Sequence, residues 1–537
     1  MAQLTTFSLS ASASNLGATA QFPKPLMCAP NVLVLPTSTM SATPAYASLV
    51  SSFTKLYRYQ HLASIAGWDQ AAMMPSKGND ARGAAMAELA VLMHNTLTDP
   101  QLATALAAAK AQTTDAVEQA SVREMERQWQ VANLLPASLV EAKSLAGSRC
   151  EHAWRTQRKA NDWQGFLGNF RDVVKYARQE ATLLAEATGL SRYDALVAKF
   201  EPGMNGATIE RIFGDLKRWL PSLITEVLAK QAKETVLTPT GVFPVANQRA
   251  LGLEVMGLLG FDFEGGRLDV STHPFCGGVA EDVRITTRYR EDDFVQAMMG
   301  IVHETGHARY EQRLPREWVH LPLGQARSMG VHESQSLSFE MQLGRSPAFL
   351  ALIAPLVKKH LGDQPAFAPS NLGNIYTRVK PDFIRVDADE LTYPAHIILR
   401  FEIERALIEG EIEADDIPRL WDEKMQAYLG IDTRGNFQNG CLQDIHWTDG
   451  AFGYFPSYTL GAMYAAQYFA TLRRLFPDLD QRVAAGDLAP IFTWFEQNIW
   501  SQASRWETPE LIERATGEPL SASHFERHLR LRYLGAE

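Results

Sequence analysis

The chain has 537 residues, of which 46% are hydrophobic and 21% charged, and its formal net charge is −10. This composition is typical of a globular protein, and the negative charge gives no electrostatic reason to expect a nucleic-acid partner. No apolar run reaches the roughly 18 residues that a membrane-spanning helix needs, so we expect no membrane partner. The four cysteines lie far apart, which argues against a disulfide framework or a thiolate zinc site and favours a reducing compartment.

The first fifty residues differ from the rest, because they contain no aspartate or glutamate and only one lysine, Lys24. A Ser-rich, acid-poor segment is one signature of an organelle transit peptide, although this one lacks arginine. The other interpretation is a disordered or untranslated extension, with the working start at Met40. We therefore place residues 1–44 outside the fold as a disordered or targeting-like extension. We expect a cytoplasmic protein, or an organelle protein if this segment acts as a transit peptide.

From residue 45 onward the pattern is mostly helical, with apolar residues at helical spacing from 46 to 66. A loop is expected over 68–80, and Asp162 and Thr208 are predicted N-caps. Similar patterns predict helices over 81–95, 98–111, 115–134, 137–160, 163–187, 208–232 and 244–259.

Residues 268–271 and 283–289 are the clearest β signals in the chain, and the second alternates and is β-branched. We expect the two strands to pair across a turn at 273–278. They precede the motif described below, so a substrate main chain could add to the edge of their sheet.

The second half of the chain returns to helical patterns after a loop at 313–327. Helices are predicted over 331–343, 346–361, 368–380, 390–410, 416–428, 459–475, 484–499, 507–514 and 521–533. There is no internal repeat and no long Pro/Ser linker after residue 44, so we expect one mainly α domain over 45–537.

The central motif is His303-Glu304-Thr305-Gly306-His307, an H-E-x-x-H pentapeptide. On a helix, four residues advance about 400°, so both rings leave one face, one turn apart. Two imidazoles so placed can bind one Zn²⁺, and Glu304 can take a proton from the metal-bound water. The alternative is a buried helix with two core histidines. A glutamate after the apolar run 295–302 would then be buried without a partner, which a metal supplies.

A catalytic zinc site needs a third protein ligand, and Glu333 is the candidate. It lies 26 residues after His307, across a loop long enough for a second helix to fold back. The alternative for Glu333 is a solvated carboxylate. His332 is interpreted as a capping residue or as one that supports a metal ligand.

Six stretches together resemble the M32 carboxypeptidases, the carboxypeptidase Taq-like metallopeptidases. The resemblance covers roughly residues 45–537. The stretches are H-P-F at 273–275, D-x-R-x-T at 282–286, H-E-x-x-H at 303–307, H-E-S-Q at 332–335, I-R-x-x-A-D at 384–389 and G-x-x-Q-D-x-H-W at 440–447.

The resemblance implies a large helical zincin-like (neurolysin-like) domain with a deep groove and a small β-sheet beside the metal helix. It implies a metal-dependent carboxypeptidase that removes C-terminal residues from peptides with broad specificity and difficulty at proline. It also implies a homodimer with one divalent metal per subunit. A site of two histidines and one glutamate suits Zn²⁺ first, while Co²⁺ and Mn²⁺ fit the same ligands.

A carboxypeptidase must bind a free C-terminal carboxylate, for which a fixed arginine is suited. Arg385 is the first candidate, with an ion pair to Asp387 or Asp389 as the alternative role. Arg284 is the second candidate, and its alternative role is to brace its strand.

His446 and Tyr454 are candidate donors to the oxyanion of the transition state. Asp444 is expected to orient His446 or a metal-binding histidine. The resemblance places His273 near the site, although a turn histidine is an equal interpretation.

Two other functions remain open at this point. An endo-acting oligopeptidase would use the same metal core without a carboxylate clamp. A catalytically dead helical binding protein would keep the fold, but the intact His303, Glu304, His307 and Glu333 argue against it.

Overall fold

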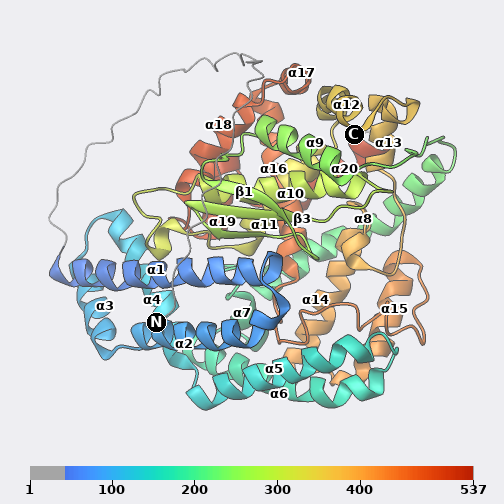
Figure 1. Cartoon of the computed structure of the whole chain (residues 1–537). Coiled ribbons are helices and arrows are strands. Elements are labelled where there is room, and N and C mark those ends of the chain that lie inside the picture. Colours follow the sequence, from blue (N-terminus) through green and yellow to red (C-terminus); the bar gives the residue numbers. More distant parts are fainter. Residues whose placement is uncertain (1–42, 536–537) are drawn as a thin grey trace, which may run out of the picture. The chain divides into compact units, whose positions relative to one another are not determined.

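The computed structural model describes residues 43–535, which form many helices and one small sheet (Figure 1). The α-helices are α1 (Pro44–Ala72), α2 (Asn79–Leu97), α3 (Pro100–Gln112), α4 (Ala116–Leu134), α5 (Ala137–Gln157), α6 (Trp163–Thr188), α7 (Arg192–Val197), α8 (Gly206–Gln231), α9 (Val245–Leu258), α10 (Val295–Gln312), α11 (Met329–Leu337), α12 (Pro347–Leu361), α13 (Pro369–Tyr376), α14 (Tyr393–Glu409), α15 (Ile417–Leu429), α16 (Pro456–Leu475), α17 (Leu479–Ala484), α18 (Ala489–Asn498), α19 (Thr508–Thr516) and α20 (Ala522–Leu534). The strands are β1 (Gly266–Val270), β2 (Cys276–Val279) and β3 (Asp282–Thr287).

Shorter helical segments complete the description. The segment η3 (Ser338–Gly344) is a π-helix that continues directly from α11. The 3-10 segments are η1 (Ser76–Gly78), η2 (Pro322–Gly324), η4 (Pro365–Phe367), η5 (Arg385–Asp387), η6 (Ala414–Asp416) and η7 (Trp500–Gln502). The mainly α fold expected from the sequence is confirmed, whereas most of the predicted extension, residues 1–42, lies outside the described residues.

Several helix boundaries differ from the prediction. α1 extends into the expected loop as far as Ala72. Trp68, in this added part of the helix, is buried, and the centre of its ring lies 4.4 Å from the guanidinium carbon of Arg284. Asp162 is the N-cap of α6, as predicted, and accepts from the N–H of Gly165 at 2.8 Å. Thr208 is not an N-cap, because the side chain of Asn205 caps α8 and accepts from the N–H of Thr208 at 2.9 Å.

The sheet is not the simple hairpin that the sequence predicts. β3 lies in the middle, parallel to β1 and antiparallel to β2. β2 begins within the expected turn at 273–278 and ends one residue beyond it. The hairpin therefore joins β2 to β3, and β1 pairs with the opposite edge of β3. Two of the four residues of β2 are glycines, which have low β propensity, so the strand gave no sequence signal.

α10 is buried because it packs against the sheet on one side and the main helical core on the other. Ile301 and Ala308 join a cluster with the sheet residues Val283 and Ile285, while Val302 belongs to the larger helical core. Figure 1 shows α10 beside the sheet, where it contacts β2 and β3, and α10 also contacts α11. The apolar surroundings account for two faces of α10, and the polar H-E-x-x-H residues lie towards α11.

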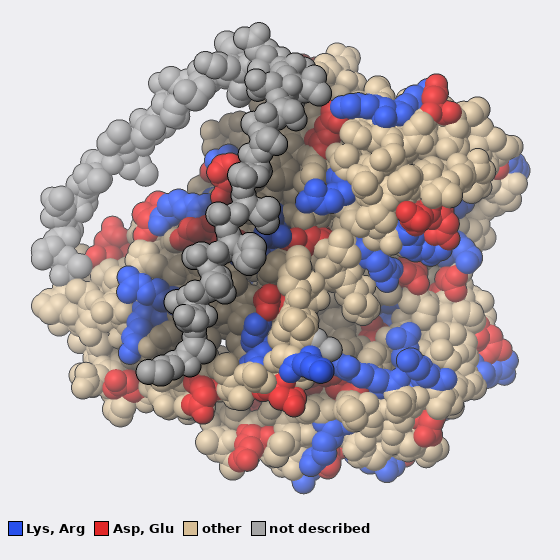
Figure 2. Space-filling view, viewed as in Figure 1, with Lys and Arg blue, Asp and Glu red and all other residues tan. Residues whose placement is uncertain are grey.

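Charged side chains of both signs are interspersed on the face shown in Figure 2, which also has a hollow near its middle. None of the helices within residues 43–535 combines the length and apolar character needed to cross a membrane.

The contact between α10 and α11 requires a glycine. A Cβ at Gly306 would lie 2.5 Å from the carbonyl oxygen of Gln335 and 2.6 Å from Cα of Ser336. Both obstacles are backbone atoms, so they cannot move without moving α11. Gly300, on the same helix, offers a contrast, because a Cβ there would meet only Oγ1 of Thr287 at 3.9 Å.

We predict that Gly306→Ala destabilises the protein by about 1–3 kcal/mol, because the added methyl group must separate two packed backbones. The matched Gly300→Ala should be neutral or should stabilise by up to about 1 kcal/mol, because alanine is the better helix former. Urea unfolding of the two metal-free variants measures both effects. Equal stability of the two variants would contradict the packing at Gly306.

Candidate metal centre

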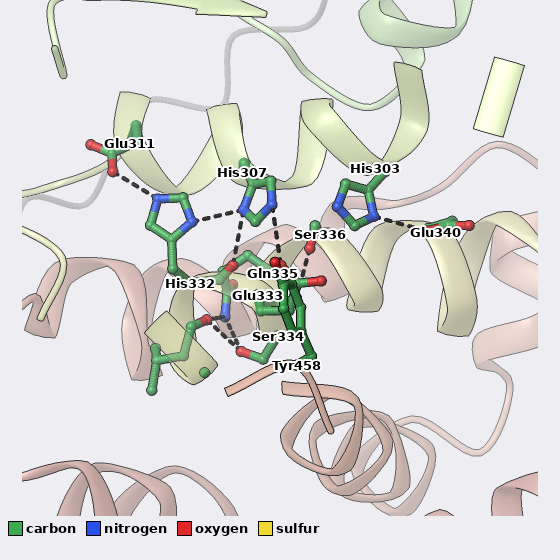
Figure 3. A network of polar contacts seen from close by, with 12 residues as sticks. His303, His307, Glu311, His332, Glu333, Ser334, Gln335, Ser336, Glu340 and Tyr458 are labelled. Atoms are coloured by element: carbon green, nitrogen blue, oxygen red, sulfur yellow. Dashed lines mark hydrogen bonds and ion pairs between the residues drawn. The ribbon is translucent and has the colours of Figure 1, made fainter. Parts of the chain in front are cut away.

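Two helices bring the predicted metal-binding residues together. His303 and His307 come from α10 and Glu333 from α11, and one potential ligand atom from each lies within 4.8 Å of the other two (Figure 3). Among residues 43–535, this is the single group of three or more such side chains with that spacing. Two imidazoles and a carboxylate, all partly buried, are a donor set that fits a divalent cation such as Zn²⁺.

Hydrogen bonds at Nδ1 orient both histidine rings. Nδ1 of His303 lies 2.8 Å from Oε2 of Glu340, and Nδ1 of His307 lies 3.1 Å from the carbonyl oxygen of His332. A proton on each Nδ1 would satisfy these acceptors and leave Nε2 as the free lone pair. Nε2 of His307 faces Glu333, 3.5 Å from Oε2, which is the side where a shared cation would bind.

His332 contacts His307 on the side of the ring opposite to Glu333. Its Nδ1 lies 2.7 Å from Nδ1 of His307, and its Nε2 lies 2.8 Å from Oε1 of Glu311 (Figure 3). The interpretation of His332 as a residue that supports a metal ligand is therefore consistent with its contacts. Glu311 and Glu340 were not predicted from the sequence. Glu311 could have been found, because it lies four residues after His307 on the same helix. Glu340 lies in the π-helix η3, where α-helical spacing from Glu333 does not apply.

The start of α11 is fixed by a buried carboxyl. Glu201 accepts from Oγ of Ser328 at 2.7 Å and from the N–H of Gly330. Burial raises the pKa of Glu201 to about 7, against the effect of these hydrogen bonds. On the other side, Gly461 of α16 allows close approach, because a Cβ there would lie 2.8 Å from Cβ of Glu333. The position of Glu333 is thus set by two neighbouring elements.

Glu304 is buried, and its carboxylate forms no ion pair with a basic side chain among the described residues. Burial raises its pKa to about 7, with His303 opposing and the carboxylates of Glu333 and Glu340 adding to the increase. A carboxyl group with a pKa near neutrality can both accept and return a proton.

Arg385 is buried, and its ion pair differs from the predicted one. Its Nε lies 2.9 Å from Oδ1 of Asp444, and its Nη1 donates to the hydroxyl of Tyr393 at 2.8 Å. The expected partners Asp387 and Asp389 are not used in this way; Asp389 instead accepts from the N–H of Thr392 at 3.0 Å. Burial raises the pKa of Glu333, and the charge of Arg385 is among the effects that oppose this increase, so the guanidinium lies near the carboxylate of this predicted metal ligand.

Asp444 also departs from its predicted contacts. Instead of orienting His446 or a metal-binding histidine, it bridges two guanidinium groups, with Oδ2 2.7 Å from Nε of Arg400. Burial opposes its charge, but Arg400 and Arg385 hold the pKa of Asp444 below its usual range. Asp444 therefore positions Arg385.

His446, Tyr454 and Tyr458 form an aromatic group near Glu333. Nε2 of His446 lies 3.1 Å from the hydroxyl of Tyr458, and the ring centres of Tyr454 and Tyr458 are 5.3 Å apart. Burial and the charge of Arg385 lower the pKa of His446 to about 4, so the ring is neutral at pH 7. Tyr458 was not predicted, although it follows in the same aromatic stretch, and Figure 3 shows it beside Glu333.

The two remaining candidates have other surroundings. Arg284 pairs with Asp282 through two contacts of 2.9 and 2.7 Å and packs on Trp68, which is the bracing role kept as its alternative. His273 is exposed between β1 and β2, and we find no hydrogen bond of its ring among the described residues.

The fold and the site together define a helical metallopeptidase, with an H-E-x-x-H helix and a glutamate from the next helix. The model of the carboxypeptidase Taq (M32) metallopeptidase family matches residues 48–533. The chain belongs to this family. It is a metallocarboxypeptidase, a peptide hydrolase whose family implies a divalent metal and peptide substrates.

Several relatives support this assignment. Thermostable carboxypeptidase 1 of Thermus thermophilus is 36% identical over 506 residues, which cover 92% of this chain and 99% of that protein. The structure of Trypanosoma cruzi metallocarboxypeptidase 1 is similar with a TM-score of 0.90 and 48% identity, covering 91% of this chain and 99% of that one. The M32 carboxypeptidase of Deinococcus radiodurans has a TM-score of 0.87 and 31% identity, with coverages of 91% and 98%. These likenesses favour a carboxypeptidase over an endo-acting oligopeptidase.

We predict a pH effect on the metal-free protein. Burial opposes protonation of His303, but its hydrogen bond to Glu340 and the charges of Glu333 and Glu340 raise its pKa to about 10. Because this value lies above the ordinary 6.5, the stability contributed by His303 is complete below pH 6.5 and is lost as the pH rises through about 10.

Urea unfolding of the metal-free protein and of Glu340→Gln, at several values between pH 6.5 and 10, measures this contribution. The variant should lose less stability over that range, because its His303 keeps less of the raised pKa. Parallel stability curves for the two proteins would contradict the predicted role of Glu340.

Proposed function

We propose that residues 45–537 form a single catalytic domain that removes C-terminal residues from peptides by attack of a metal-activated water. In this proposal His303, His307 and Glu333 hold one divalent cation, and Glu304 is the catalytic base. The observation that carries it is the convergence of the three proposed ligand side chains. Arg385 lies close enough for its charge to oppose the rise in the pKa of Glu333.

The cation bound by this site would polarise the scissile carbonyl and acidify a water molecule. Two imidazole nitrogens and one carboxylate oxygen suit Zn²⁺ first, with Co²⁺ or Mn²⁺ as alternatives. The hydrogen bonds from Glu340 and the carbonyl of His332 would hold the two rings with Nε2 towards the cation.

Glu304 would accept a proton from the attacking water and return it to the leaving amine. Its burial favours this role, since the raised pKa places proton uptake near neutral pH. Tyr454, Tyr458 and His446 lie together near Glu333 and would face the oxyanion. Neutral His446 is bonded to the hydroxyl of Tyr458 and would act through that residue.

Arg385 would bind the terminal carboxylate of the substrate. Asp444 and Tyr393 already hold its Nε and Nη1, while among residues 43–535 we find no hydrogen bond from its Nη2. A guanidinium held on one side presents its remaining N–H groups in a fixed direction, which suits a carboxylate.

The edge strand β2 would receive the main chain of the substrate. Burial is the main cause of the raised pKa of the Cys276 thiol in β2, and the nearby carboxylate of Glu304 adds to it. A peptide paired with this edge would therefore pass beside the catalytic base.

Other parts of the proposal rest on the family. They are broad specificity with difficulty at proline, a deep groove and a homodimer. The proposed cytoplasmic location follows instead from the scattered cysteines, and an organelle location is the alternative if residues 1–44 act as a transit peptide. The single-domain boundary is supported by the contacts of the chain from Thr43 onward, which form one unit.

We predict that the protein cleaves a peptide with a free C-terminus and spares the same peptide as its C-terminal amide, because the amide offers Arg385 no charge. Arg385→Ala should lose about 2–4 kcal/mol of transition-state binding, or roughly 30- to 900-fold in kcat/KM. Initial rates on the peptide pair measure both effects, and Arg284→Ala, which loses a strand brace, should keep the preference. Equal cleavage of acid and amide would contradict the carboxypeptidase mechanism.

We predict that Glu304→Gln lowers kcat by about 10²–10⁴-fold, because the amide cannot accept the proton. The variant should retain the zinc content of the unchanged protein, since Glu304 is not one of the proposed ligands. Elemental analysis and peptide-cleavage rates on the same sample distinguish the two effects. Near-normal kcat with full metal content would exclude Glu304 as the base.

A further inference from the structure

The hydrogen bond that orients His303 comes from an unusual segment. Glu340 lies in the π-helix η3, whose wider turn is closed by the N–H of Arg345 donating to the carbonyl of Glu340 at 3.0 Å. π-Helical turns are rare and are found mostly at functional sites. The two carboxylate oxygens of Glu340 are divided between Nδ1 of His303 at 2.8 Å and Nη2 of Arg345 at 2.5 Å. The geometry of η3 therefore decides where the Nδ1 acceptor of His303 lies.

A side chain of the last helix holds this π-helix. Arg532 of α20 donates from Nη1 to the carbonyl of Met341 and from Nη2 to the carbonyl of Gln342 at 3.4 Å. These are the two residues that directly follow Glu340. Both carbonyl groups belong to the last turn of η3, where carbonyl groups lack partners within the helix, and a guanidinium supplies several donors in a fixed plane.

Arg532 is itself fixed by a buried carboxylate. Its Nη1 lies 2.9 Å from Oε2 of Glu390, and this oxygen also accepts from the hydroxyl of Tyr533 at 3.2 Å. The other oxygen, Oε1, lies 2.6 Å from Nε2 of His528. Both members of the Arg532–Glu390 pair are almost fully buried. Burial opposes the charge of Glu390, but Arg532 and His528 hold its pKa well below its usual range, so the pair stays ionised.

We propose that Arg532 is a positioning residue of the metal centre: through the carbonyl groups of η3 it places Glu340, and Glu340 places the ring of His303. The inference deepens the proposed function and rests on His303 being a metal ligand. It assigns the C-terminal helix a role in metal affinity, although α20 offers no ligand.

A buried ion pair can also be purely structural, and then its loss lowers stability alone. A positioning role predicts in addition a change at the metal. Loss of a residue that orients a ligand typically weakens metal binding by about 10- to 100-fold. Arg530 provides a matched control on the same helix, because it pairs with Glu526 at 2.9 Å on a partly exposed face.

The test compares the unchanged protein with Arg532→Gln, Arg532→Lys and Arg530→Gln, each shown to be folded by circular dichroism. Competition with a chelator gives the dissociation constant of Zn²⁺, and the visible absorption of Co²⁺-loaded protein reports ligand geometry. Arg532→Gln should bind Zn²⁺ about 10- to 100-fold more weakly, with an altered Co²⁺ spectrum. Arg532→Lys should be intermediate, and Arg530→Gln should match the unchanged protein.

An Arg532→Gln protein that is less stable but keeps the Zn²⁺ affinity and the Co²⁺ spectrum would overturn the inference and leave the proposed function intact. If this variant does not fold, Arg532→Lys decides, and affinity equal to that of Arg530→Gln overturns the inference. Failure of the unchanged protein to bind Zn²⁺ or Co²⁺ would overturn the proposed function and the inference together.

Discussion

The close approach of α10 and α11 is the constraint on which the site depends. At Gly306 the backbone of α11 occupies the space that a side chain would need. This contact brings Glu333 within reach of His303 and His307, which their own helix cannot do. The sheet and the helical core pack against the other faces of α10, so the two histidines of the motif point towards α11. Packing of apolar surface thereby sets the geometry of a polar site.

The same packing gathers negative charge in a buried place. Glu304 and Glu333 both have raised pKa values there, mainly because of burial, while Arg345 and His303 keep Glu340 ionised. Uncompensated buried carboxylates are costly, and a divalent cation would offset that cost. Binding of the metal should then contribute to stability as well as to catalysis, since the site exists only in the folded chain.

Local spacing explains what the sequence could predict. The two histidines are four residues apart on a helix, and the loop before Glu333 is long enough for a second helix to fold back. The three predicted metal ligands could therefore be identified from the sequence. Features that depend on contacts between residues far apart in the sequence could not be predicted in this way. The ion pair of Arg385 goes to Asp444, 59 residues away, and not to its sequence neighbours. The glycine-containing strand β2 forms only because β3 offers it an edge. Glu340 was missed because a π-helix has no simple sequence signal.

The contacts of Arg385 show why such distant interactions bear on the proposed function. Asp444 binds both Arg385 and Arg400, so neither guanidinium can turn without losing a buried charge partner. The rings of Phe455 and Tyr458 lie 5.4 and 5.1 Å from the guanidinium carbon of Arg385 and limit it further. Arg284, in contrast, is committed to Asp282 and Trp68. If a terminal carboxylate binds at Arg385, the fixed separation between this residue and the metal ligands determines which peptide bond reaches Glu304. Exopeptidase selectivity would then come from the rigidity of the Arg385–Asp444–Arg400 group as much as from its charge.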